Sequence, residues 1–326
     1  MNNSHIGISY MDYYIPETTV GIDEFFALME SQGQIVYSNA VLGSREKFIC
    51  ELKSKIECKN IPIETNKDTL GMLEVLLMRY FDHHKPNDID LLIFTGPFRP
   101  LADKFSTPHK LIEKFDLEGA MIFEVGNRCC SISSAIQVAK AFLECNTKCH
   151  RAMILSQNHI RGMLDRFHQG NSIEGDGASV LVLEPSDTNV LQDYLFMNCG
   201  KFHAYLFDNA LDGIASQYLG YVASSATIID KLMKKLGISS SEIVGIIIQN
   251  INTVIARMIS KKIGVDSSII YTNNIHRYGH IADVDFVINL KDFLDGHHGG
   301  GNVICQNTGA GLTADATLIE RAWRTQ

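Results

Sequence analysis

The sequence predicts a layered α/β fold made of two similar halves. Short apolar runs that suit buried strands alternate with helical patterns along almost the whole chain. One order of elements occurs twice, and each copy closes with a Gly-x-Gly turn that leads into a strand. The chain has 326 residues, which is enough for two domains of ordinary size or for one large double domain.

The expected strands are runs of three or four apolar residues, which is the pattern of strands buried on both faces. They lie at 91–94, 121–123, 153–155, 180–183, 246–248, 269–271 and 303–305. Helical spacing of apolar residues is found between them, at 133–144, 214–236, 252–263 and 283–294. Gly237 and Gly264 follow two of these patterns, where a glycine commonly ends a helix.

The internal repeat pairs residues 72–95 with residues 226–249. Each segment reads as a helix, a polar turn and an apolar strand. The two copies then close with Gly-x-Gly turns at 175–177 and 309–311, each before a final strand. Such a repeat is the pattern of a pseudo-symmetric double domain.

Pro185, followed by Ser and Asp, interrupts the pattern between the two copies. We therefore predict an N-terminal half over 1–185, which carries the candidate nucleophile described below. The C-terminal half, 186–326, is expected to carry the other catalytic positions.

Composition excludes several classes of protein. Apolar residues make up 45% and charged residues 20% of the chain, as in ordinary globular proteins, and a net charge of -8 disfavours binding to nucleic acid. No apolar stretch reaches the ~18 residues of a membrane span. The N-terminus lacks the pattern of a secretory leader, and the eight cysteines are spaced irregularly, without CxxC or metal-ligand spacing. We expect a cytoplasmic protein with reduced thiols and no bound metal.

Cys129 lies at a predicted junction between a strand and a helix. The strand ends at Val125, a short polar segment follows, and an amphipathic helix begins after Cys130. At a helix N-terminus, free N–H groups and the helix dipole favour thiolate over thiol, which is the setting of a nucleophilic cysteine. A buried core cysteine is the alternative interpretation.

With these segments in place, the chain resembles the β-ketoacyl-acyl-carrier-protein (ACP) synthase III branch of the thiolase superfamily. The resemblance rests on the order and spacing of several motifs. They are 43–47 (GSREK), 104–108 (KFSTP), 124–139 with Cys129 at the nucleophile position, 175–178 (GDGA), 261–264 (KKIG) and 308–313 (TGAGLT). The resemblance implies the five-layered αβαβα thiolase fold, which we expect here.

Two catalytic positions depart from that branch. Its members carry His in an HQAN motif, where this chain has Gln249, and Asn in a GNTSAAS motif, where this chain has His280. The usual Cys-His-Asn set is thus Cys-Gln-His. Thiolases are similar to this arrangement, because they carry an amide in the first slot and His in the second. It implies Cys129 as nucleophile, His280 as base and Gln249 as oxyanion donor.

The same resemblance implies contacts with the substrate. Arg161 and Tyr37 fall near family residues that contact coenzyme A (CoA), and Phe105 lies in the segment that reaches the partner's acyl pocket. Asn252 ends the segment that matches HQAN. No permanently bound cofactor is implied; the donor is an acyl-CoA or acyl-ACP, both phosphopantetheine thioesters.

The expected activity is acyl transfer through an acyl-Cys129 intermediate, in specialised, polyketide-like metabolism. Two alternatives stay open: a catalytically inactive partner subunit of an active homologue, and a malonyl-condensing synthase. Because the His-Asn pair is replaced, we expect poor decarboxylation of malonyl-ACP. The resemblance implies a homodimer; an acyl carrier protein and a homologous second subunit are further candidate partners.

Overall fold

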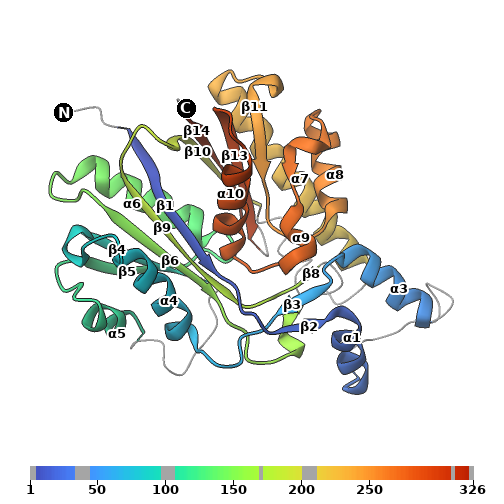
Figure 1. Cartoon of the computed structure of the whole chain (residues 1–326). Coiled ribbons are helices and arrows are strands. Elements are labelled where there is room, and N and C mark those ends of the chain that lie inside the picture. The colour runs from blue at the N-terminus through green and yellow to red at the C-terminus, as the bar shows by residue number, and fades with distance from the viewer. Residues whose placement is uncertain are drawn as a thin grey trace.

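The computed structural model of the chain describes residues 5–33, 45–96, 107–168, 172–199, 211–309 and 313–322. Figure 1 shows a wide twisted sheet with helices between and outside its two parts. In the described residues, no helix is both long enough and apolar enough to cross a membrane.

The ten-stranded sheet consists of two five-stranded units with the same internal order. In sheet order the first unit is β1 (Ile6–Tyr14), β9 (Gly177–Pro185), β6 (Ala152–Asn158), β4 (Leu91–Thr95) and β5 (Met121–Val125). The second unit is β10 (Val190–Asn198), β14 (Thr313–Arg321), β13 (Gly301–Gly309), β11 (Ile243–Ile247) and β12 (Ile270–Tyr271). In both units, the first two pairings are antiparallel and the last two are parallel. The units meet where β1 pairs with β10 at Gly7 and Val190.

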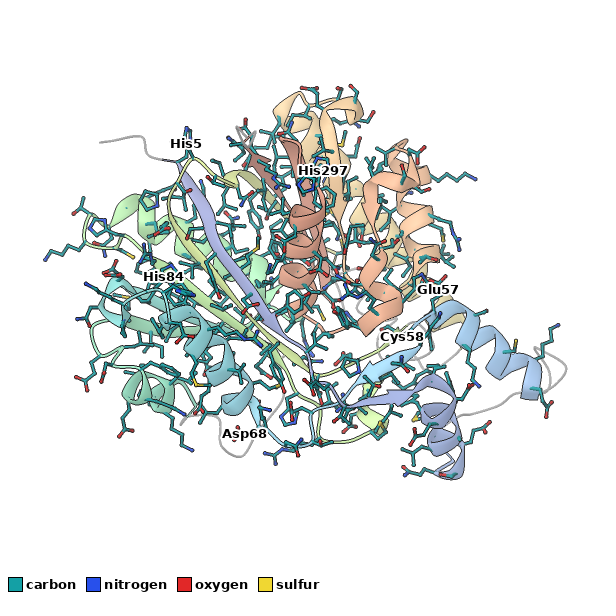
Figure 2. All side chains as sticks on the ribbon, in the orientation of Figure 1. His5, Glu57, Cys58, Asp68, His84 and His297 are labelled. Atoms are coloured by element: carbon teal, nitrogen blue, oxygen red, sulfur yellow. The ribbon has the colours of Figure 1, made fainter. Side chains whose placement is uncertain are left out.

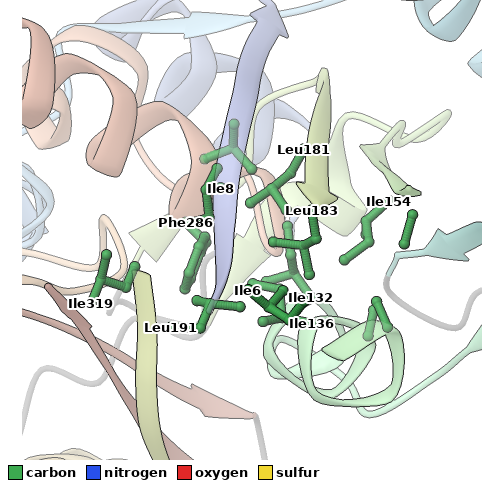
Figure 3. Close-up of a cluster of buried hydrophobic side chains, with 14 of the residues drawn as sticks. Ile6, Ile8, Ile132, Ile136, Ile154, Leu181, Leu183, Leu191, Phe286 and Ile319 are labelled. Atoms are coloured by element: carbon green, nitrogen blue, oxygen red, sulfur yellow. The ribbon is translucent and has the colours of Figure 1, made fainter. Parts of the chain in front are cut away.

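Helices fill three further layers. The central layer is formed by α6 (Ser131–Cys145) and α10 (Val284–Gly296), whose apolar faces share one core with strands of both units. Figure 3 shows part of this core, where Ile132 and Ile136 of α6 approach Ile6 of β1. The outer layers are α4 (Thr69–Phe81) with α5 (Thr107–Lys114), and α7 (Leu211–Leu236) with α8 (Thr253–Ile263). The expected αβαβα layering is therefore confirmed.

A smaller group of elements lies beside the sheet, at the lower right of Figure 1. It has its own apolar cluster, which includes Phe25, Phe26 and Ile61. Its elements are α1 (Ile22–Ser31), α3 (Arg45–Ile56), β2 (Thr19–Gly21) and β3 (Asn60–Pro62). The remaining elements are the short strands β7 (Phe167–His168) and β8 (Ser172–Ile173) and the helix α9 (Asn273–Tyr278).

Every expected strand and helix is present, and two differences concern the main sheet. The run at 269–271 contributes only Ile270–Tyr271 to the sheet, because Ile269 ends a 3₁₀ turn. The central strands β1 and β10 were not predicted. Polar residues interrupt both, and each has an irregular register, between Ile8 and Tyr10 in β1 and between Leu191 and Asp193 in β10. A search for uninterrupted apolar runs does not find such strands.

Candidate active site

Cys129 lies in a tight turn between β5 and α6, as the sequence predicts. Arg128 has φ +52°, a left-handed conformation that is uncommon for a residue other than glycine. The turn is held by the Asn127 N–H, which donates to Ser131 Oγ over 2.8 Å. Cys129 is half-buried, and Cys130 is the N-cap residue of α6. Backbone strain of this kind is common next to reacting groups.

His280 comes to the same place from the other half of the chain. Its backbone is anchored on both sides: its N–H donates to Ile173 O over 3.3 Å, and its carbonyl accepts from Gly175 N–H over 2.8 Å. Gly279 before it has φ +65°, and a Cβ there would lie 3.0 Å from Cys58 Sγ. The Gly-rich turn of the first half thus positions the histidine of the second half.

The His280 imidazole connects Cys129 with a buried carboxylate. Its Nδ1 lies 2.6 Å from Asp285 Oδ2, and the Cys129 thiol hydrogen-bonds the ring, which leaves Nε2 as the nitrogen that faces sulfur. Burial alone would lower the pKa of His280, but the Asp285 carboxylate and then Cys129 raise it well above its usual value. The ring can therefore hold a proton taken from Cys129 at neutral pH. The arrangement is that of a Cys-His-Asp triad.

Gln249 contacts the backbone of the nucleophile turn. Its Nε2 donates to the Cys129 carbonyl over 2.9 Å, and its Oε1 accepts from Tyr221 Oη over 2.9 Å and from Thr308 N–H over 3.0 Å. The backbone donor fixes which end of the amide is oxygen. Gln249 is 1% exposed, and of its two amide protons one is used in the bond to the Cys129 carbonyl.

The other predicted site residues lie farther from the chemistry or outside the description. Asn252 is the N-cap of α8, where its side chain accepts from Ile255 N–H over 2.9 Å. Arg161 is exposed on the segment after β6. Tyr37 and Phe105 lie outside the described residues. Cys305 is fully buried in the central core, as expected for a structural cysteine.

Sequence reasoning missed Asp285 and Tyr221. Asp285 is fully buried in a helix segment whose other buried residues, apart from Asn289, are apolar, and a polar residue within such a run could have signalled a specific partner. Tyr221 is brought to Gln249 by the long helix α7, and no local pattern marks it.

The sequence also contains two pairs of adjacent histidines, His83–His84 and His297–His298. His84 stacks on Tyr80 and His297 stacks on Phe293, in well-separated parts of the molecule (Figure 2). Within the described ranges, no three His, Cys, Asp or Glu side chains are arranged to hold a metal ion.

Comparisons with known proteins agree with this architecture. Residues 233–321 match the family model described as 3-oxoacyl-[acyl-carrier-protein] synthase III C terminal. Beta-ketoacyl-[acyl-carrier-protein] synthase III of Chlorobium luteolum is 23% identical over 233 residues, which is 62% of this chain and 69% of that protein.

Solved structures resemble the chain over nearly its whole length. The acyltransferase ChlB3 superposes with a TM-score of 0.79 at 16% identity, covering 98% of both chains. Xanthomonas campestris OleA with bound lauric acid and lauroyl-CoA gives 0.81 at 14% identity, covering 97% of this chain and 99% of that one. FabH, the 3-oxoacyl-(acyl carrier protein) synthase III of Pseudomonas aeruginosa PAO1, gives 0.77 at 15% identity, covering 98% and 99%. The fold is the thiolase fold, and the resemblance to its synthase III branch is confirmed.

Proposed function

We propose that this synthase III-like member of the thiolase superfamily is an acyltransferase that carries an acyl group as a thioester on Cys129. The observation that carries the proposal is the hydrogen-bonded series Cys129, His280 and Asp285. It supplies a thiol, a base that can hold its proton, and a carboxylate that orients the base. These are the parts of an activated nucleophile.

In the first half-reaction, the Cys129 thiolate attacks the carbonyl carbon of an acyl thioester. The carbonyl becomes a tetrahedral oxyanion and then re-forms as the bond to the donor sulfur breaks. The His280 imidazolium gives its proton to the departing thiolate. The products are acyl-Cys129, a neutral His280 and the free thiol of the donor.

In the second half-reaction, the neutral His280 removes a proton from an acceptor hydroxyl or amine as that acceptor attacks acyl-Cys129. The Cys129 thiolate leaves, and the imidazolium–thiolate pair is restored. Malonyl decarboxylation places a different demand on the site, because it needs two hydrogen-bond donors at one thioester oxygen. Gln249 can offer at most one further N–H, and His280 would have to serve as donor and base at once. This favours acceptors that need deprotonation.

The names of similar proteins support the class of donor. The Chlorobium luteolum relative is named as an acyl-carrier-protein synthase, and the OleA structure contains lauroyl-CoA. We infer that acyl-ACP or acyl-CoA supplies the acyl group here. The altered catalytic set further favours a specialised, polyketide-like pathway over the start of ordinary fatty-acid synthesis.

Intact mass spectrometry tests the proposal. Incubation with a series of acyl-CoAs and acyl-ACPs should give a single acyl adduct, absent in Cys129→Ala, that an alcohol or amine acceptor discharges. Labelled malonyl-ACP should release carbon dioxide about 10²–10³ times more slowly than with an ordinary synthase III run in parallel, since one oxyanion donor is missing. Comparable release would favour the malonyl-condensing alternative. No adduct with any donor would favour a non-catalytic subunit.

A further inference from the structure

The Asp285 carboxylate, which lies against His280 Nδ1, accepts four hydrogen bonds. Oδ2 accepts from the Asn250 backbone N–H over 2.8 Å as well as from His280 Nδ1. Oδ1 accepts from Ile281 N–H over 2.8 Å and from Asn250 Nδ2 over 3.2 Å. Four donors hold the carboxylate as an acceptor in one orientation, with one oxygen directed at the imidazole.

The orientation of Asn250 depends on a second buried amide, Asn289. Asn289 Nδ2 donates to the Ile248 carbonyl over 2.8 Å and to Asn250 Oδ1 over 2.9 Å. A backbone carbonyl can only accept, so this contact identifies the nitrogen of Asn289. Because this nitrogen donates to the Asn250 side chain, the accepting atom there is the amide oxygen. The NH₂ group of Asn250 therefore faces Asp285.

The series continues towards the surface through Asn274. Asn289 Oδ1 accepts from Asn274 Nδ2 over 3.0 Å, and Asn274 Oδ1 accepts from Arg277 Nη1 over 3.0 Å. Asn274 and Asn289 are fully buried, whereas the Arg277 side chain is 53% exposed and also pairs with Asp292 over 3.0 Å. We call Arg277, Asn274, Asn289 and Asn250 the amide chain.

The hydrogen bonds that link the members of the amide chain point the same way, from the Arg277 guanidinium to the Asp285 carboxylate, and Asn274 Nδ2 donates in addition to Asp292 Oδ2 over 3.0 Å. Hydrogen bonds aligned in this manner polarise one another, so each strengthens the next. The cation at one end and the carboxylate at the other fit that direction. A core that needed only packing would place apolar side chains here, because buried amides are costly unless every group is paired.

We propose that Asn289 is a positioning residue for the reaction, and that the amide chain sets how firmly Asp285 holds the proton on His280. This inference rests on the proposed function and extends it to residues that never meet the substrate. Without Asn289, the Asn250 amide can turn its oxygen towards Asp285, which repels the carboxylate from its position beside His280. The His280 imidazole then loses its partner, and Cys129 loses a correctly placed acceptor for its proton.

The test measures the rate of Cys129 alkylation by iodoacetamide as a function of pH in the full chain, read by peptide mass. Beyond burial, the largest effects on the pKa of His280 come from Asp285 and then from Cys129, and the buried Glu174 forms a backbone bridge with His280. In Asn289→Leu, the midpoint of the alkylation profile should rise by about one pH unit, so the alkylation rate at pH values below the wild-type midpoint should fall about tenfold. Arg277→Leu, at the half-exposed end of the amide chain, should raise the midpoint as well, by a smaller amount. Ile288→Ala, a buried apolar neighbour on α10, should lower the melting temperature and leave the midpoint unchanged.

A wild-type midpoint in Asn289→Leu would overturn the proposal and leave the amide chain a packing feature. If that variant does not fold, Arg277→Leu decides: a raised midpoint supports the amide chain and an unchanged one overturns it. A wild-type protein that already titrates like an unpaired thiol would overturn the Cys129–His280 pair as well, and with it the proposed function. The two failures are therefore distinguishable.

Discussion

Cys129 and Cys130 are neighbours at the start of the same helix, yet their thiols lie in opposite surroundings. Cys129 is half-buried and hydrogen-bonded to His280. Cys130 is fully buried, where Thr313 Oγ1 donates to its sulfur over 3.5 Å. Burial, and after it the Asp315 carboxylate, raises the pKa of the Cys130 thiol well above its usual value. One thiol thus lies beside a base and the other beside a buried carboxyl group.

The comparison shows that a helix N-terminus does not by itself make a nucleophile. Both cysteines share the helix start, so its dipole and free N–H groups cannot distinguish them. The second half of the chain makes the difference, because it brings His280 to one thiol and Asp315 to the other. The proposed nucleophile is thus selected by tertiary structure, across the junction of the two sheet units.

The largest expected effect separates the two cysteines directly. Cys129→Ala should abolish both the acyl adduct and rapid iodoacetamide labelling, because Cys129 is the thiol that interacts with His280. Cys130→Ala should keep both, with some loss of stability from the cavity it leaves in the core. Peptide mapping of the labelled protein checks the result. Labelling that survives in Cys129→Ala and disappears in Cys130→Ala would reverse the assignment.

The second-largest effect is expected when the His280 imidazole is removed. His280→Ala should slow acylation of Cys129 by about 10²–10⁴, the usual worth of a positioned acid–base group. Its alkylation should then follow the pH dependence of an ordinary thiol, with a midpoint near 8.5 or above. His280→Asn should not restore the rate, since an amide cannot take the proton. His150→Ala, on the exposed surface, is the matched control. An alkylation profile that is the same in His280→Ala and wild type would exclude the pairing.

Most of the fold could be predicted because local patterns determine it. Uninterrupted apolar runs such as 180–183 form strands buried on both faces, and Gly264 ends α8 with φ +74° as its position indicates. The strands β1 and β10 could not be found this way. Polar residues and irregular register break their pattern, and only their place between neighbouring strands makes them part of the sheet.

The candidate site was predictable only in part, for a related reason. The order of the motifs led to Cys129, His280 and Gln249, and the structure brings these three together. The bonds made by Gln249 depend on Tyr221 and Thr308, which come from distant elements. The position of Asp285 depends on a backbone turn in which Ala282 has φ +47°. Such contacts are set by tertiary packing, and no local sequence pattern specifies them.

The smallest expected effect concerns the carboxyl of Asp283, which lies beside the first residues of α6. Asp283 is 1% exposed, and neither of its oxygens makes a hydrogen bond of normal geometry with the described residues. Burial raises the pKa of Asp283 to about 7, against a lowering by the nearby amides of Ser131 and Ile132. In the unfolded chain the pKa of this carboxyl is about 3.9. Between these two values the folded state holds a proton that the unfolded state has lost.

Stability should therefore fall as pH rises from about 4 to 7, and stay level above that range, as far as this group is concerned. Asp283→Asn removes the titration, so its free energy of unfolding relative to wild type should increase between pH 5 and pH 8. The full shift corresponds to on the order of 4 kcal/mol, of which coupling to Asp315 leaves a part to each carboxyl. Urea unfolding at several pH values measures the difference, with the exposed Asp82→Asn as a control that should show no such trend. A constant difference between Asp283→Asn and wild type at all pH values would mean that Asp283 is ionised throughout.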